Sequence, residues 1–158
     1  MTALKGIYLL LLRLDAELAD LQVGRLGRYR CAAGHYLYVG SAFGPGGLAA
    51  RLAHHERPAK ARPHWHIDYL RAQARLIEAW AVGSTLRREC CWARALAAEP
   101  GLSIPIPGFG ATDNGCVSHL LYSPGRPALR LLTETLLGCL AREGSQDFTL
   151  EITSYEGA

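Results

Sequence analysis

Tyr8 and Tyr38 lie thirty residues apart in two apolar segments of strand-like composition. On adjacent antiparallel strands, two such side chains can share one face of a sheet with their hydroxyls converging. A phenol has a pKa near 10 and is a poor base at neutral pH, so a close cation such as Arg51 would have to lower that pKa. The pair could then take a proton from water, although each tyrosine taken alone is more typical of a half-buried strand aromatic.

Arg51 and His55 are four residues apart, which puts them on the same face of a helix. The guanidinium fork matches phosphate oxygens, and His55 could relay a proton or hold a tyrosine hydroxyl. His54 would point about 100° away, so we expect it outside the site. Glu89, in a later helical segment, could hold a divalent ion that keeps several waters. These groups suit phosphodiester hydrolysis; the plain alternatives are a surface arginine and a solvated helix acid.

A second group of polar side chains follows a basic loop. His64 and Asp68 are four apart and could share a helix face, while His66 would sit elsewhere on that helix. One interpretation is a shelf for substrate, with Trp65 stacking on an unpaired base. The other is a helix cap with a core aromatic, which is slightly favoured for Trp65.

Zinc binding by a histidine of that group with the cysteines is a further alternative. Cys116 and His119 have a C-x-x-H spacing. However, the adjacent Cys90 and Cys91 cannot easily face one tetrahedral site from a helix, and no CxxC pair is present. The sequence therefore favours reduced, mostly core-filling thiols over zinc.

The composition of the 158 residues indicates one globular domain. Apolar residues make up 49% and charged residues 20%, which excludes a disordered chain. No run approaches about 18 uncharged apolar residues, so no transmembrane helix is expected. No signal peptide is recognised, and we expect a cytoplasmic protein.

The net charge of +3 is unevenly distributed. Residues 25–94 hold twelve Lys or Arg against four acids, or +8, whereas residues 101–158 hold three against six, or −3. An arginine-rich segment suits phosphate, and the alternative is a basic solvated surface without a partner.

The order of elements favours an α+β fold, because strands and helices are mixed without regular βαβ alternation. We expect strands at 6–14, 35–41, 75–82 and 117–122, and an irregular strand or loop at 21–31. Helices are expected at 48–56, 64–73, from 84 or 85 to about 98, and at 128–142, with loop at 103–115.

Several motifs together resemble the GIY-YIG nuclease superfamily. The triplets are Gly6-Ile7-Tyr8 and Tyr38-Val39-Gly40, followed by Ser41, then Leu48 and Arg51 as an L-x-x-R helix, and Glu89 on a later helix. The tracts 64–70 (HWHIDYL), 108–113 (GFGATD) and 116–120 (CVSHL) resemble a compact stand-alone branch of that superfamily. The 29 residues between the triplets exceed the usual gap and require a longer loop or an extra hairpin.

The resemblance implies a small mixed or antiparallel sheet flanked by helices. It implies one domain over residues 1–143, with its core at about 4–95 and a branch-specific extension at about 96–143. Residues 144–158 would be a short tail or an edge strand.

The resemblance also implies an endonuclease that hydrolyses DNA, or less readily RNA, with Mg²⁺ or Mn²⁺. Tyr38 is expected to be the general base and Tyr8 its hydrogen-bonded partner, although the reverse remains open. Arg51 would bind the scissile phosphate and Glu89 the metal. The remaining expected residues are Gly40, Ser41, Arg62, His64, Trp65 and His66 for nucleic acid, and Asp68, Asn114 and His119 in support.

Two other functions are compatible with the same residues. The first is a DNA-binding module with a weak or inactive centre that acts with a repair partner. The second is a zinc-stabilised interaction domain.

Overall fold

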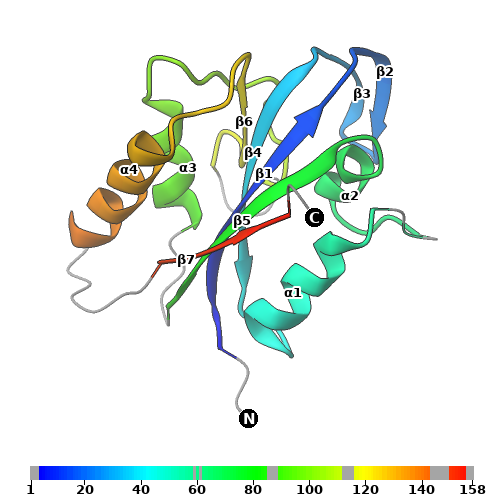
Figure 1. The fold of residues 1–158 in the computed structure, drawn as a ribbon. Coiled ribbons are helices and arrows are strands. Elements are labelled where there is room, and N and C mark those ends of the chain that lie inside the picture. Colours follow the sequence, from blue (N-terminus) through cyan, green and yellow to red (C-terminus); the bar gives the residue numbers. More distant parts are fainter. Residues whose placement is uncertain are drawn as a thin grey trace.

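The computed structural model describes residues 4–58, 60, 62–84, 89–111, 116–142 and 150–155, and it shows an α+β fold (Figure 1). A five-stranded antiparallel sheet has the order β6-β4-β1-β5-β7, and β2 and β3 form a separate two-stranded sheet. The predicted fold class is therefore confirmed. The strands are β1 (Gly6–Leu14), β2 (Leu18–Val23), β3 (Gly27–Cys31), β4 (Gly34–Ala42), β5 (Arg75–Gly83), β6 (Leu120–Ser123) and β7 (Leu150–Ser154). The helices are α1 (Gly47–Glu56), α2 (His66–Arg71), α3 (Glu89–Ala97) and α4 (Leu129–Arg142).

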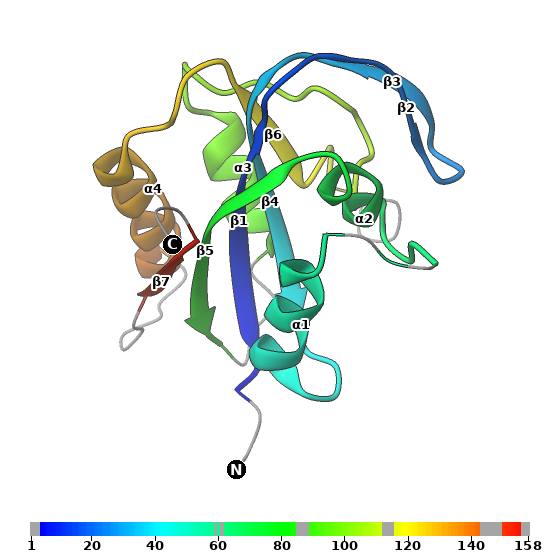
Figure 2. The same cartoon turned by 45° about the vertical axis from the view of Figure 1, so that its right-hand side comes forward.

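The central strand β1 is buried along nearly its whole length. It pairs with β4 on one side and β5 on the other, and helices cover both of its faces. A strand covered on both faces needs apolar side chains at successive positions, which explains the unbroken run Ile7–Leu12. The helices α1 and α2 lie on one face of the sheet, and α3 and α4 on the other (Figure 2).

The long segment between the two triplets forms the extra hairpin, β2–β3. Its turn includes Gly24, whose φ of +51° lies in the left-handed region that glycine tolerates best. The hairpin packs against α2, so the insertion extends the α1/α2 face of the molecule.

Two predicted boundaries were wrong. The helix predicted at 64–73 spans only His66–Arg71, because the Asp68 carboxylate binds the N–H groups of His64 and Trp65 and holds both ahead of the helix. The strand predicted from Val117 begins at Leu120, because the backbone of Val117 and His119 bonds to the preceding loop at Gly108 and Phe109.

The C-terminal strand β7 adds to the outer edge of β5. This matches the edge-strand alternative for the last part of the chain. None of the helices in the described residues is long and apolar enough to span a membrane.

Candidate functional site

Tyr8 and Tyr38 lie on the α1/α2 face of the sheet. In the β1–β4 register Tyr8 is opposite Gly40 and Tyr38 is opposite Leu10, so the tyrosines are diagonal neighbours, with ring centroids 6.4 Å apart. A Cβ on Gly40 would come within 2.4 Å of the Tyr8 ring and hydroxyl. Glycine is therefore required at position 40 by the tyrosine that crosses it.

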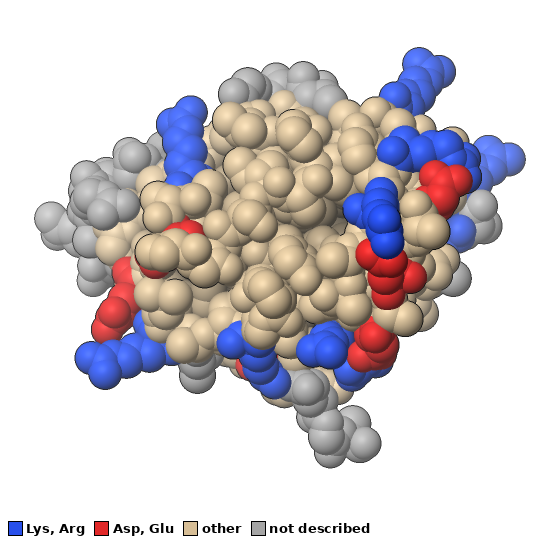
Figure 3. All heavy atoms as spheres, turned by 90° about the horizontal axis from the view of Figure 1, so that it is seen from above, with Lys and Arg blue, Asp and Glu red and all other residues tan. Residues whose placement is uncertain are grey.

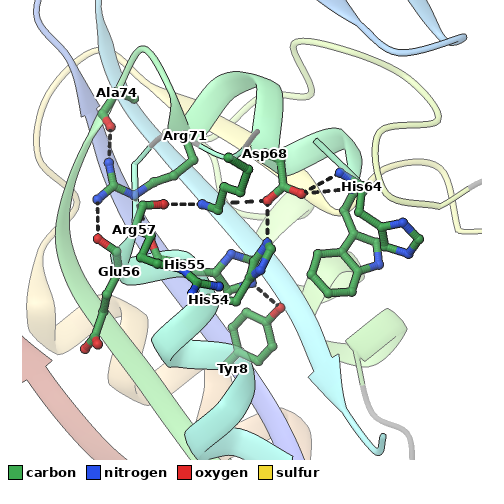
Figure 4. A network of polar contacts seen from close by, with 11 residues as sticks. Tyr8, His54, His55, Glu56, Arg57, His64, Asp68, Arg71 and Ala74 are labelled. Atoms are coloured by element: carbon green, nitrogen blue, oxygen red, sulfur yellow. Dashed lines mark hydrogen bonds and ion pairs between the residues drawn. The ribbon is translucent and has the colours of Figure 1, made fainter. Parts of the chain in front are cut away.

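His55 connects α1 to this pair. Its Nε2 is 2.7 Å from the Tyr8 hydroxyl, and its ring lies 5.3 Å from the Tyr8 ring and 6.3 Å from the Tyr38 ring (Figure 4). Burial, followed by the neighbouring His54, lowers the pKa of His55 to about 3. His55 is therefore neutral near pH 7, and its Nε2 can accept the hydroxyl hydrogen of Tyr8.

The two tyrosines differ in their surroundings. Burial raises the pKa of both, well above the ordinary value for Tyr8 and to about 12 for Tyr38, while Arg51 lowers each. Tyr8 is 1% exposed and Tyr38 8% exposed. Within the described part of the chain the Tyr38 hydroxyl has no hydrogen bond, so Tyr38 is the tyrosine with a hydroxyl open to a new partner.

Arg51 lies beside the tyrosines with its guanidinium 4.2 Å from the centroid of the Trp65 ring. This cation–π contact engages the planar face of the guanidinium and leaves the N–H groups at its edge able to bind an anion. Trp65 also contacts His54, with ring centroids 4.7 Å apart. The half-buried Trp65 therefore positions Arg51. Trp65, His54 and Asp68 are called the wall of the site below.

Asp68 is the buried charge that organises this wall. One of its oxygens is 2.8 Å from His54 Nε2 and 3.8 Å from Lys60 Nζ. The other accepts hydrogen bonds from the backbone N–H groups of His64 and Trp65. Burial acts to raise the pKa of Asp68, but these hydrogen bonds outweigh it and the pKa is lowered.

His54 thus lies inside the network, which corrects the expectation that its direction on the helix would exclude it. Helix α2 and the residue that precedes it bring Asp68 and Trp65 to the side of α1 that His54 faces. Helix periodicity gives the direction of a side chain but not what later packs against it.

Arg71 is a buried cation that sequence analysis missed. Its guanidinium donates hydrogen bonds to the backbone carbonyls of His55, Glu56 and Ala74 (Figure 4). Carbonyls at the end of a helix have no intrahelical partner, so Arg71 caps α1 directly after its functional residues. Arg71 is the last residue of the short helix α2, where an arginine is ordinary in sequence, so its burial against α1 has no local signal.

Glu89 is the first described residue of α3 and is 9% exposed. Its Oε2 is buried and has no hydrogen-bond partner. The carboxylate acts on the pKa of both Tyr38 and His119, which places it within electrostatic range of the tyrosine site. A buried carboxylate oxygen without a donor fits a bound cation.

Ser41 and His119 lie apart from the tyrosine face. Ser41 is opposite Ile7 on the α3/α4 face. His119 lies beyond the edge of β4, where its Nδ1 is 3.0 Å from the Val39 carbonyl. Asn114 lies outside the described residues.

His64, His66 and Arg62 lie on the outer side of this region. His64 and His66 line a hollow of about 510 Å³ between the β2–β3 hairpin and α2, together with Gly24, Arg25, Leu26 and Tyr69. His66 accepts a hydrogen bond from Gly110, and Arg62 is exposed.

In the folded chain, acids from outside the basic segment 25–94 neutralise part of its positive charge. Arg28, Arg30 and Arg75 pair with Asp20, Glu17 and Asp15, three acids that precede the segment. Figure 3 shows basic and acidic side chains mixed around the rim of one face, with neutral residues in the middle. These ion pairs remove part of the positive charge of the segment that could otherwise bind phosphate.

The cysteines differ from the expectation of reduced thiols. Cys90 is joined to Cys116 and Cys91 to Cys139, while Cys31 is free and buried. Sequence spacing could not show this, because the partners lie 26 and 48 residues apart. The adjacent cysteines do face different partners, as expected from their positions on one helix.

The chain belongs to the family described as domain of unknown function DUF123, whose sequence model matches residues 7–140. No curated protein and no solved structure matches the chain. The matched range includes Ile7 and Tyr8 of the first triplet, the whole second triplet, the helix with Arg51, Glu89 and the segment with His119.

Proposed function

We propose that the protein is a metal-dependent endonuclease of the GIY-YIG type that hydrolyses phosphodiester bonds in DNA. The observation that carries the proposal is the convergence of Tyr8, Tyr38, His55 and Arg51 on one face of the sheet. A proton-accepting system and a phosphate-binding cation then lie next to each other, as phosphodiester hydrolysis requires.

In this proposal Arg51 binds the scissile phosphate, and its stacking on Trp65 limits the side-chain freedom lost on binding. Tyr38 faces the attacking water, because its hydroxyl is the one without a partner in the described residues. The hydrogen bond between the Tyr8 hydroxyl and His55 Nε2 fixes the positions of both side chains next to Tyr38.

Glu89 would hold Mg²⁺ or Mn²⁺ through its unpartnered carboxylate oxygen. The ion would supply positive charge to the phosphate and the leaving oxygen. The high pKa of Tyr38 is consistent with a site that requires added positive charge before the phenol can act as a base.

The test is cleavage of supercoiled plasmid and of branched and single-stranded oligonucleotides at low salt with Mg²⁺ or Mn²⁺. Arg51→Ala and Glu89→Gln should each reduce the rate by roughly 10²-fold or more. Arg94→Ala on α3 and Glu134→Gln on α4 are matched controls at exposed positions and should cleave normally.

Nicking that survives Glu89→Gln at the original rate would contradict the metal assignment. Metal-independent binding of DNA without any cleavage would instead favour the alternative, a DNA-binding module that acts with a repair partner.

A further inference from the structure

Cys90, Cys116 and His119 form a compact group of soft ligands at the edge of β4. Their Sγ and imidazole nitrogen atoms all lie within 4.8 Å of one another. Cys90 Sγ is 3.9 Å from His119 Nε2. Ligands of one tetrahedral zinc ion, with Zn–S near 2.3 Å and Zn–N near 2.0 Å, are roughly 3.5–3.8 Å apart, so the distance between Cys90 and His119 is close to that of a metal site. The two sulfur atoms are bonded to each other in the structure and would have to separate to this distance on reduction.

The orientation of His119 supports the same interpretation. Its Nδ1 is 3.0 Å from the Val39 carbonyl, which places the ring proton on that nitrogen and turns the Nε2 lone pair toward the cysteines. Metal-binding histidines are commonly fixed by such a hydrogen bond from the nitrogen that does not bind the ion. His119 is 3% exposed, so this orientation is set by packing.

We propose that, when Cys90 and Cys116 are reduced, they bind one thiophilic divalent cation together with His119 Nε2, and that Zn²⁺ is the ion this donor set favours. Two thiolates and one imidazole are three of the four tetrahedral ligands, and water can complete the set because Cys90 is only half-buried. The ion would tie α3 to the loop before β6.

The disulfide between Cys90 and Cys116 is the oxidised form of the same pair. A thiol reductant opens it to two thiols and is itself oxidised to a disulfide. Binding then joins the cation to two thiolates, and the two protons go to solvent.

The group His54, His55 and Asp68 also brings ligand atoms within 4.8 Å. There, however, His54 and Asp68 bond to each other, His55 bonds to Tyr8, and Asp68 accepts two backbone hydrogen bonds. His55 Nδ1 has no hydrogen bond within the described part of the chain, but His54 Nε2, His55 Nε2 and both oxygens of Asp68 already have partners. The cysteine group, which offers two thiolates, is therefore the one assigned to a metal.

The experiment uses the full chain purified in reductant, with its metal content measured after gel filtration. The metal is then removed with a chelator and the chain is titrated with Co²⁺, which reports thiolate ligation by an ultraviolet charge-transfer band and tetrahedral geometry by visible bands. About one equivalent should bind with both signatures, as expected for a site of this donor set.

The variants identify the ligands. Cys90→Ser and His119→Gln should weaken Co²⁺ binding by roughly 10²-fold or more, since even groups that only orient a ligand are worth 10–100-fold. Cys91→Ser is the matched control on the same helix and should bind as the unaltered chain does. Arg94→Ala, at an exposed position of the same helix, should also bind normally. Because the readout is Co²⁺ binding rather than cleavage, failure of the proposed nuclease activity would leave this result intact.

A second measurement does not depend on whether variants fold. Zn²⁺ added to the unaltered reduced apo chain should protect Cys90 and Cys116, but not Cys91, from alkylation mapped by mass spectrometry. The proposal is overturned if the reduced chain binds no Co²⁺ through thiolate, if protection at Cys90 and Cys116 does not change, or if their disulfide persists in reductant.

Discussion

On the α1/α2 face of the central sheet, buried polar side chains bond to one another, whereas on the α3/α4 face the buried layer is almost entirely apolar. The first face carries Tyr8, Tyr38, His55 and Asp68 around a few aromatic rings. The second carries Ile7, Leu9 and Val39 from the sheet against Trp92, Leu96 and Leu136 from the helices.

The difference separates two tasks within one sheet. The apolar layer gains free energy from burial without any geometric requirement on hydrogen bonds. In the polar layer, directional hydrogen bonds hold Tyr8, His55 and Asp68 in position, while the Tyr38 hydroxyl and His55 Nδ1 have no hydrogen bond within the described residues. We therefore expect substitutions on the α3/α4 face to change stability first, and those on the α1/α2 face to change the site.

The largest effect should come from paired tryptophan substitutions on the two faces. Trp80 is 0% exposed among the apolar side chains, so Trp80→Ala should lower the free energy of unfolding by about 3–5 kcal/mol. Trp65→Ala should cost much less stability, because Trp65 is half-buried, but it should weaken DNA binding by freeing Arg51. Denaturant unfolding and DNA titration of both variants measure the contrast, and equal stability losses would contradict it.

A smaller stability effect is expected at Asp68. Asp68→Asn removes the charge that accepts bonds from His54, His64 and Trp65, and it should cost about 2 kcal/mol of unfolding free energy. Asp20→Asn, which breaks an exposed pair with Arg28, is the matched control and should leave the unfolding midpoint unchanged. If Asp68→Asn is also neutral, the network does not hold the wall of the site.

Sequence reasoning predicted the elements better than the contacts between them. The strand at 6–14 matches β1 because an apolar run of that length has few alternatives. The length of the inserted segment predicted a longer loop or an extra hairpin, and the structure has the hairpin. Arg51 and His55 could be placed on one helix face from their spacing alone.

The missed features depend on residues distant in the chain. The Asp68–His54 bond and the three carbonyl contacts of Arg71 join α1 to α2 across the basic loop, and no local periodicity encodes them. The cysteine pairs and the acids that neutralise Arg28, Arg30 and Arg75 are likewise products of tertiary structure.

The pH dependence of stability gives a third test of the polar face. The pKa of His55 is about 3 in the folded chain and near 6.5 when unfolded. Between these values only the unfolded state binds the proton, so acidification from pH 6.5 toward 3 should destabilise the fold, by at most about 1.4 kcal/mol per pH unit from this residue. The stabilising contribution is complete above pH 6.5.

The measurement is the free energy of unfolding of the native chain and of His55→Phe from pH 7 to 4. The variant should lose part of the slope between pH 6.5 and 4. His119, whose pKa burial also lowers, remains in both proteins and does not affect the difference. The contribution of Asp68 belongs to a lower window, because its lowered pKa means loss of stability only as pH falls below about 4. Identical slopes would show that His55 is not held neutral by burial.

The smallest effect on stability is expected for the ion pairs of Arg28 and Arg30 on the β2–β3 hairpin. These pairs extend the comparison of the two faces of the sheet to the surface of the molecule. Asp20 and Glu17 hold Arg28 and Arg30 on the exposed side of this hairpin. Exposed pairs of this kind contribute little to folding, so Asp20→Asn with Glu17→Gln should leave the thermal midpoint unchanged. The double change frees two arginines and should strengthen DNA binding at low salt, with a steeper loss of affinity as salt rises, because each additional phosphate contact releases a counterion.

Glu134→Gln, which frees Arg130 on α4, is the control, since that helix lies on the opposite face of the sheet. Equal gains from both changes would mean that DNA responds only to net charge, whereas a gain restricted to the hairpin would mean that DNA lies along the α1/α2 face.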